Sequence, residues 1–261
     1  MLKLSNNTVA VFIKQLTSNI RQPVFLGLAG VWLVMGLVFA FFSDQHVSQY
    51  VSMFMVLIVG MQLTGVATSC VTEDRTTMNL RFMGMAGVKP RQYCTGTFAA
   101  VFLMAMFICV VYAVVGGYRG TNFFIFLGFT WLASAVSALL GITMGLSKWP
   151  WLTTPVGMLL GLAPMIAAMN ENMEDIFRFL YTLQIRRVMD YMAIRAEEEI
   201  YEHICEYCGE IVMCIKDEAE DVVEILAGRG MMEEAIIVTL INGAIVLGLF
   251  IFMHRKYGLN G

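Results

Sequence analysis

Six long apolar runs alternate with polar segments along the chain. They cover residues 24–42, 51–70, 97–118, 121–146, 151–169 and 235–253, and none contains Asp, Glu, Lys or Arg. An apolar run of about 18 residues or more can cross the hydrocarbon core of a membrane as a helix, because a helix pairs every backbone N–H and C=O within its own segment. The pattern therefore predicts an all-α polytopic membrane protein with six transmembrane helices.

Residues 4–20, ahead of the first run, have the helical repeat of an amphipathic segment. The apolar positions Val9, Phe12, Ile13, Leu16 and Ile20 share one face, and the polar positions Lys14, Gln15 and Asn19 lie off it. Pro23 then ends the helix. Such a helix beside a span is predicted to lie in the cytoplasmic interface, either as a topology anchor or with a role in coupling.

Residues 71–96 gather charge between the second and third runs. A helix is predicted over 73–86, with Met78, Phe82 and Met85 on one side and Arg75, Asn79 and Arg81 around the rest. Gly87 and Pro90 provide its stop signals. Charged residues at a membrane boundary usually act as anchors, but this segment is long enough to be an ordered cytoplasmic helix.

Residues 170–234 form the longest polar segment and carry most of the acid. They hold 17 of the 20 Asp and Glu and six of the 17 Lys and Arg, a local balance of 6 − 17 = −11. Their apolar residues recur at helical spacing, which predicts an outer helical hairpin that turns near Gly209 or between Gly228 and Gly230. The hairpin is either a solvated helix pair that covers the outer end of the transmembrane helices or a gate for a substrate or partner. The chain then divides into 1–169, 170–234 and 235–261.

Composition agrees with a membrane protein, with 58% hydrophobic and 14% charged residues and a mean hydropathy of +0.71. Basic residues cluster in the N-terminal segment, in 71–96, at Lys148 and in the tail at Arg255 and Lys256. Because short cytoplasmic segments are enriched in Lys and Arg, both termini are predicted to be cytoplasmic, in the cell (plasma) membrane. No removable signal peptide is expected before the first run.

Three of the six cysteines fall together in the predicted outer segment, at Cys205, Cys208 and Cys214. They allow a disulfide, free thiols, or a zinc site that includes His203. A structural zinc site normally has a second, distant CxxC pair, which the sequence lacks. A disulfide is therefore favoured, and no metal is expected.

Catalytic and nucleotide-binding motifs are absent from the sequence. There is no Gly-Lys dipeptide, hence no phosphate loop, and no ionisable residue inside the six runs that would serve a proton relay or an intramembrane enzyme. The runs do contain uncharged polar residues, which can line a substrate path or bond between helices and to carbonyls one turn earlier: Gln62, Thr64, Thr68, Thr130, Ser134, Ser137, Thr239 and Asn242.

Two small-residue motifs fall in the fourth and fifth runs, Gly141-x-x-x-Gly145 and Gly157-x-x-x-Gly161. Glycines at this spacing allow two helix backbones to approach closely. Because glycine is common in membrane helices, packing within the chain is favoured over a contact between two copies.

The order of residues around the charged segment resembles the permease subunits of type-2 ATP-binding-cassette (ABC) exporters. The string begins with an acidic-basic cluster and continues through a Met-rich helix to a Gly-Val-x-Pro turn, an aromatic residue and a glycine. Here these are Glu73-Asp74-Arg75, Leu80 to Met85, Gly87-Val88-Lys89-Pro90, Tyr93 and Gly96. The predicted layout of an interfacial helix, six spans and a large outer segment between spans five and six is also similar.

The resemblance implies a permease that moves an amphipathic or hydrophobic substrate outward. It would work with a second permease copy or a related permease and with two ABC ATPase subunits, which would hold the ATP and Mg, so the chain itself would be no enzyme. The residues implied in coupling to the ATPase are Glu73, Asp74, Arg75, Gly84, Met85, Gly87, Lys89 and Pro90. No nucleic-acid partner is expected. The alternatives are a membrane anchor or sensor whose acidic outer hairpin binds a partner, and an intramembrane enzyme.

Overall fold

The computed structural model describes residues 6–21, 24–43, 47–169, 176–188, 192 and 211–257, and these are helical almost throughout with no strand among them. Five helical stretches in this part of the chain are long and apolar enough to cross a membrane: Met53–Thr76, Pro90–Val115, Gly120–Leu146, Pro150–Ala167 and Gly230–Arg255. The prediction of an all-helical, multi-pass membrane protein is confirmed to this extent. Helix α2 (Val24–Ser43) coincides with the first predicted run, but its described apolar stretch, Gly30–Phe39, is shorter than a span. The count of six therefore stays a prediction.

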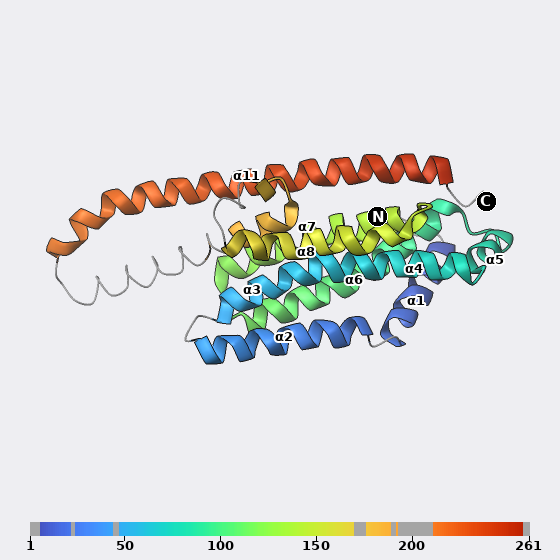
Figure 1. Cartoon of the computed structure of the whole chain (residues 1–261), viewed down its shortest axis with the longest axis horizontal. Helices are drawn as coiled ribbons and strands as arrows, with labels where there is room; N and C mark the ends of the chain where they lie inside the picture. The colour runs from blue at the N-terminus through green and yellow to red at the C-terminus, as the bar shows by residue number, and fades with distance from the viewer. Residues whose placement is uncertain are drawn as a thin grey trace.

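Helix α7 (Gly120–Leu146) lies at the centre of the bundle. It packs against α4 (Thr64–Thr76), α6 (Pro90–Val115) and α11 (Ile211–Tyr257), while α8 (Thr153–Met169) packs on the π-helical turn η1 (Ile58–Leu63). Helix α3 (Val47–Leu57) continues through η1 into α4, and α2 packs beside it. The bundle helices run side by side, with the short α5 (Asn79–Met85) and the C-terminal end of α11 at one end of the molecule (Figure 1).

Both small-residue motifs pack within the chain, as predicted. A Cβ atom on Gly141 would lie 2.4 Å from the Thr64 carbonyl oxygen, and one on Gly145 would lie 2.7 Å from Cβ of Val71. In α8, a Cβ on Gly161 would lie 3.2 Å from Cβ of Met61. The glycines thus let α7 approach α4 and let α8 approach η1 more closely than side chains would allow.

The predicted helix over 73–86 is wrong in its first half. Residues 73–76 end α4, the same continuous helix that forms the second span, and α5 begins separately at Asn79. Between them Met78 has a φ of 60°, a left-handed conformation that ends a helix. The Thr76 and Thr77 hydroxyls both donate to the Glu73 carbonyl, at 3.0 and 2.7 Å. Side-chain bonds of this kind satisfy the last carbonyls of a helix and so favour a break there.

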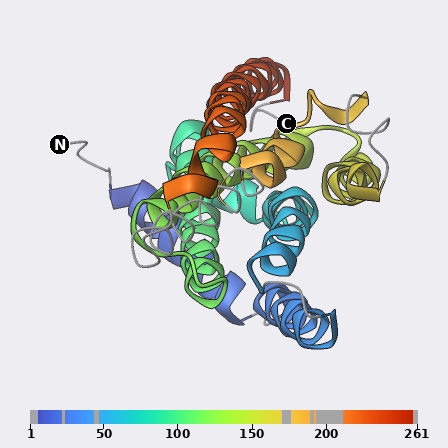
Figure 2. The ribbon, with the colours of Figure 1, turned by 90° about the vertical axis from the view of Figure 1, so that its left-hand side faces the viewer.

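The last span is part of a much longer helix than predicted. Helix α11 contains 47 residues, about 70 Å at 1.5 Å per residue, and it projects beyond the other helices at the end opposite α5 (Figures 1 and 2). It passes through Gly228 and Gly230, so the turn predicted there is wrong. A single glycine costs a helix only about 1 kcal/mol relative to alanine, and the neighbouring residues are mostly good helix formers. The alternative turn near Gly209 lies outside the described residues.

Candidate functional site

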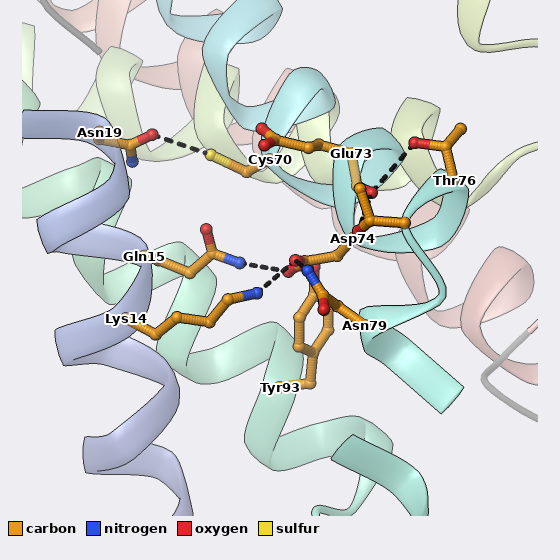
Figure 3. Close-up of polar contacts among 10 residues, drawn as sticks. Lys14, Gln15, Asn19, Cys70, Glu73, Asp74, Thr76, Asn79 and Tyr93 are labelled. Atoms are coloured by element: carbon orange, nitrogen blue, oxygen red, sulfur yellow. Dashed lines mark hydrogen bonds and ion pairs between the residues drawn. The ribbon is translucent and has the colours of Figure 1, made fainter. Parts of the chain in front are cut away.

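Asp74, near the end of α4, is a buried carboxylate that accepts hydrogen bonds from four side chains (Figure 3). Lys14 forms an ion pair with Oδ1, and Asn79 Nδ2 donates to the same oxygen at 3.4 Å. Gln15 Nε2 and the Tyr93 hydroxyl donate to Oδ2 at 2.6 and 3.0 Å. Burial of a charge is costly unless it is paired and hydrogen-bonded, and here both oxygens have two donors each.

The four donors come from three different elements, so this carboxylate joins four helices. Lys14 and Gln15 lie on α1 (Asn6–Arg21), Asn79 opens α5, and Tyr93 lies in the first turns of α6. We call Asp74 with these four residues the Asp74 junction. It fixes the amphipathic helix and the short α5 to two spans at once, in the region where sequence analysis predicted coupling.

Two further contacts hold α1 against the spans. The Cys70 thiol donates to Asn19 Oδ1 at 3.2 Å, one turn of α4 before Asp74. A Cβ on Gly96 would lie 2.9 Å from the Thr8 carbonyl oxygen, so glycine is required there for α1 to approach α6. The chain of α1 thus bonds through its polar face, while Val9, Ile13 and Ile20 of its apolar face are exposed. This is the orientation expected of an amphipathic helix that lies at a membrane surface.

Arg75 ties α4 to the opposite side of the bundle. Its Nη1 donates to the carbonyl oxygens of Gly145 and Ser147, each at 2.8 Å. Gly145 belongs to the last turn of α7 and Ser147 directly follows the helix, where orphan carbonyls and the negative end of the helix dipole favour a cation. Asp74 and Arg75, adjacent in sequence, therefore connect α4 in two directions.

Helix α5 presents an apolar face outward. Leu80 is buried, whereas Met78, Phe82 and Met85 are 58%, 62% and 67% exposed. Gly84 is also exposed, with open space around it, and Gly87 has a φ of 82° that ends the element. Large exposed apolar side chains that cluster on one element are typical of a surface that contacts a partner or a membrane. We call Met78, Phe82, Gly84 and Met85 the α5 tip.

The predicted coupling residues thus separate into different roles. Asp74 and Arg75 are structural connectors, Glu73 is exposed, and Gly84, Met85 and Gly87 lie at or beside the α5 tip. Lys89 and Pro90 cap α6: Pro90 is its first residue, and the Lys89 N–H donates to Gln92 Oε1 at 2.9 Å. Pro90 was predicted as a stop signal, and it is the start of the next helix.

Sequence reasoning did not connect Asp74 with Lys14, Gln15, Asn79 and Tyr93. One signal was present, because only three acids, Asp44, Glu73 and Asp74, lie outside residues 170–234. Lys14, on the polar face of the N-terminal helix, therefore had few acidic residues as possible partners. Because Lys14 and Asp74 are 60 residues apart in the sequence, no local pattern indicates that they pair.

The polar residues proposed for a substrate path bond mostly within the protein. The Thr130 hydroxyl donates to the Phe126 carbonyl at 2.8 Å, and the Ser134 hydroxyl lies 3.8 Å from the Cys109 thiol. Thr64 is fully buried, and neither its hydroxyl nor Gln62 Oε1 has a hydrogen-bond partner among the described residues. The contacts of Thr130 and Ser134 match the alternative of bonds within and between helices, whereas those of Gln62 and Thr64 do not.

Residues 176–188, which we call the inserted segment, enter the bundle. The buried side chains in this segment are Leu180, Tyr181, Thr182, Leu183, Gln184, Ile185 and Val188. The Tyr181 hydroxyl lies 2.7 Å from the Ser137 hydroxyl of α7, and Asn242 Nδ2 of α11 donates to the Phe179 carbonyl at 2.8 Å. The expectation of a solvated helix pair is therefore wrong for this part of the predicted outer segment.

The inserted segment is also held by charged side chains. Arg178 forms an ion pair with Glu234 of α11, with Nη2 and Oε2 at 2.5 Å, and Arg187 Nη1 lies 3.1 Å from the same oxygen. Arg186 Nη1 donates to the Pro164 carbonyl of α8 at 3.4 Å. Asn242 lies eight residues beyond Glu234, about 12 Å along the helix, so the segment reaches the middle of the candidate span Gly230–Arg255. The backbone turns at Phe179, and the Asn242 amide satisfies the carbonyl of this residue.

Cys70, Cys94 and Cys109 are free, buried thiols. The predicted disulfide among Cys205, Cys208 and Cys214 falls on side chains outside the described residues. In the part of the chain that the structure describes, no group of three or more His, Cys, Asp or Glu residues is placed to hold a metal ion. Both oxygens of the Asp74 carboxylate are already bonded by side chains of the protein. The Asp74 junction therefore attaches helices to one another.

Comparison with protein-family models, with curated proteins and with solved structures finds no match to the chain. A proposal for the function therefore rests on three features of the structure: the Asp74 junction, the α5 tip and the inserted segment.

Proposed function

We propose that this chain is the permease subunit of a type-2 ABC exporter, which moves an amphipathic or hydrophobic substrate outward on ATP hydrolysis by a partner. The observation that carries the proposal is the Asp74 junction together with the α5 tip. A partner can move the spanning helices only if it contacts an exposed surface that is rigidly connected to them. The α5 tip is exposed, and Asn79 at the start of α5 bonds to the carboxylate that also holds α1, α4 and α6.

Each connection in the junction has a place in this mechanism. When a partner moves the α5 tip, Asp74 and Tyr93 receive the displacement at the ends of α4 and α6. Arg75 carries it to the end of α7 through the Gly145 and Ser147 carbonyls. A rigid tie at one end of several helices converts a small shift into a tilt, because packed interfaces switch between arrangements instead of deforming gradually.

The complete assembly in this proposal contains two permease copies, or this permease and a related one, and two ABC ATPase subunits that bind ATP and Mg. The chain contributes no nucleotide site of its own and acts as no enzyme. Six spans are proposed, with α2 as the first. The exposed apolar faces of α2 and α11 then contact membrane lipid or the second permease.

The α5 tip is tested by placing a charge on it. Phe82→Asp is expected to weaken capture of the ABC ATPase from solubilised membranes by about tenfold or more, because aromatic side chains at the centre of an interface often contribute 2 kcal/mol or more. Folding should be unaffected, since Phe82 is exposed. The measurement is quantitative mass spectrometry of proteins that copurify with the tagged chain.

Trp149→Asp is the matched control, because Trp149 is another exposed aromatic residue, in the α7–α8 turn rather than on α5. It should retain the ATPase. Equal capture by Phe82→Asp and by the unmodified chain would contradict docking through the α5 tip. Recovery of well-folded chain with no ABC ATPase at all would contradict the exporter and favour an anchor or sensor.

The proposed orientation places both termini and the α5 tip in the cytoplasm of the cell, in the plasma membrane. The structure brings α5 and the C-terminal end of α11 to one end of the bundle (Figure 1), and the basic residues Arg81, Lys89 and Arg255 lie in these parts. In short segments such residues mark the cytoplasmic side.

Single cysteines in a background without the native ones test this orientation. Lys89→Cys should react with a membrane-impermeant maleimide only after permeabilisation, whereas Arg119→Cys should react in intact cells. Both positions are exposed, so reactivity reports the side of the membrane. The reverse pattern would invert the topology and place the α5 tip outside, where no ATP-driven partner acts.

A further inference from the structure

A pocket of about 540 Å³ opens between α6, α7 and α11, at the end of the bundle that also carries α5. Its lining includes Arg91 and Phe98 of α6, Leu139 of α7, and Phe250, His254 and Arg255 of α11. None of these residues belongs to the Asp74 junction or to the α5 tip. The pocket is therefore a separate feature, which the proposed transport function does not use.

The basic residues of this pocket lie toward the ends of their helices, and the apolar residues lie further along the helices into the bundle. Arg91 is the second residue of α6 and Arg255 lies near the end of the described part of α11, so both residues lie at the α5 end of the pocket, which we call its mouth. Phe98 lies seven residues deeper along α6 and Phe250 five residues deeper along α11, about 10 and 7 Å. A ligand with an anionic head and an apolar tail matches this order.

The positive charge at the mouth has no partner within the described part of the chain. No ion pair or hydrogen bond joins Arg91 or Arg255 to another described residue, and no Asp or Glu lines the pocket. The positive end of the α6 dipole beside Arg91 is offset by the negative end of the α11 dipole beside Arg255, so the two guanidinium groups decide the sign of the charge here. A negatively charged group is therefore favoured here over a neutral or cationic one.

His254 supplies a second, independent indication. Its Nε2 is buried, and it forms no hydrogen bond with the described residues, while its ring lies 5.8 Å from that of Phe250. Buried polar atoms in proteins nearly always have a partner. His254 lines the pocket, so a bound ligand is one source of the missing partner.

The pocket also continues onto an apolar helix surface. On α11 the neighbouring side chains Leu247, Ile251 and Phe252 are 49%, 46% and 55% exposed, and they lie in the candidate span Gly230–Arg255. A small soluble anion would not contact this apolar surface, whereas the acyl chains of a lipid would pack along it. Basic pockets between membrane helices at the cytoplasmic boundary suit the headgroups of anionic lipids.

We propose that this pocket binds an anionic phospholipid, with the phosphate between Arg91, Arg255 and His254 and an acyl chain along Phe98, Leu139 and Phe250. The lipid thereby bridges α6 and α11, which both line the pocket. This binding does not depend on whether the protein is an exporter.

Native mass spectrometry of the full chain tests the proposal. The protein is reconstituted in vesicles of phosphatidylcholine and phosphatidylglycerol, extracted in mild detergent, and its retained lipids are counted. We expect one phosphatidylglycerol to be retained in preference to phosphatidylcholine. Arg91→Gln/Arg255→Gln should lower this preference about thirtyfold, since each basic residue near the surface changes the affinity for an anionic lipid by about fivefold. Arg91→Lys/Arg255→Lys should keep most of it.

Arg21→Gln/Arg81→Gln is the matched control, because it removes two exposed charges from the same part of the protein outside the pocket. It should retain the lipid preference. Thr95→Trp, at a pocket-lining residue, should block binding with every charge in place, and size-exclusion elution checks that each variant is folded. Equal retention of the two lipids by the unmodified chain, or equal loss in both double variants, would overturn the proposal. Displacement of the lipid by excess inorganic phosphate would instead identify a site for a small anion.

Discussion

Asp74→Ala is expected to destabilise the protein by about 3 kcal/mol, because it removes the acceptor of four side chains at once. Loss of one partner from a buried charge pair typically costs 3–5 kcal/mol. The lower end applies here, since the Lys14 side chain is 40% exposed and water can solvate it. The buried hydroxyl of Tyr93 and amide of Gln15 lose their partner without that compensation.

The measurement is unfolding of the purified protein in mixed micelles of increasing denaturing detergent. Glu73→Ala serves as the matched control, because Glu73 is an exposed acid in the same helical turn. It should change the free energy of unfolding by less than about 0.5 kcal/mol. If the two variants lose equal stability, Asp74 does not hold the four helices together.

Gly141→Ala and Gly128→Ala are expected to have effects of opposite sign, although both glycines lie in α7. A Cβ at Gly141 would lie 2.4 Å from the Thr64 carbonyl oxygen and 2.6 Å from Cβ of Ala67. Helices α4 and α7 must then move apart, and overpacking of this kind costs about 1–3 kcal/mol or more. At Gly128 nothing lies within 4 Å, so the better helix propensity of alanine should stabilise by up to about 1 kcal/mol.

The same unfolding assay gives the comparison directly. Because Thr68 also donates to the Gly141 carbonyl at 2.9 Å, separation of α4 and α7 should break this bond as well and add to the loss. A Gly141→Ala variant as stable as Gly128→Ala would show that the two backbones are less closely packed than described.

The location of the long apolar helices could be predicted because lipid imposes a simple rule on any helix that crosses it. A spanning helix must be apolar, about as long as the hydrocarbon core is thick, and self-sufficient in backbone hydrogen bonds. The run 121–146 accordingly differs from α7 by one residue at its start, and 151–169 differs from the end of α8 by none. The polar residues that flank an apolar run are not subject to this rule. Helices α4, α6 and α11 therefore continue beyond their apolar runs, into segments that were predicted to be separate from the spans.

Sequence analysis singled out Asp74 as a candidate residue but did not predict which helices its carboxylate joins. Periodicity correctly put Val9, Ile13 and Ile20 on one face of α1, yet it could not say that this face is exposed and that the polar face bonds to protein. In water the apolar face would be the buried one, whereas beside a membrane lipid can cover it. The same ambiguity hid the inserted segment, since helical spacing at Tyr181 and Ile185 does not distinguish a solvated helix from one packed among spans.

The inserted segment also has a kinetic consequence for any opening of the bundle at its end. One short stretch of chain is bonded to α7 through Tyr181, to α8 through Arg186, and to α11 through Arg178 and Arg187. Separation of any of these three helices there breaks at least one of these contacts. Withdrawal of the stretch would therefore add to the activation barrier for opening at this end.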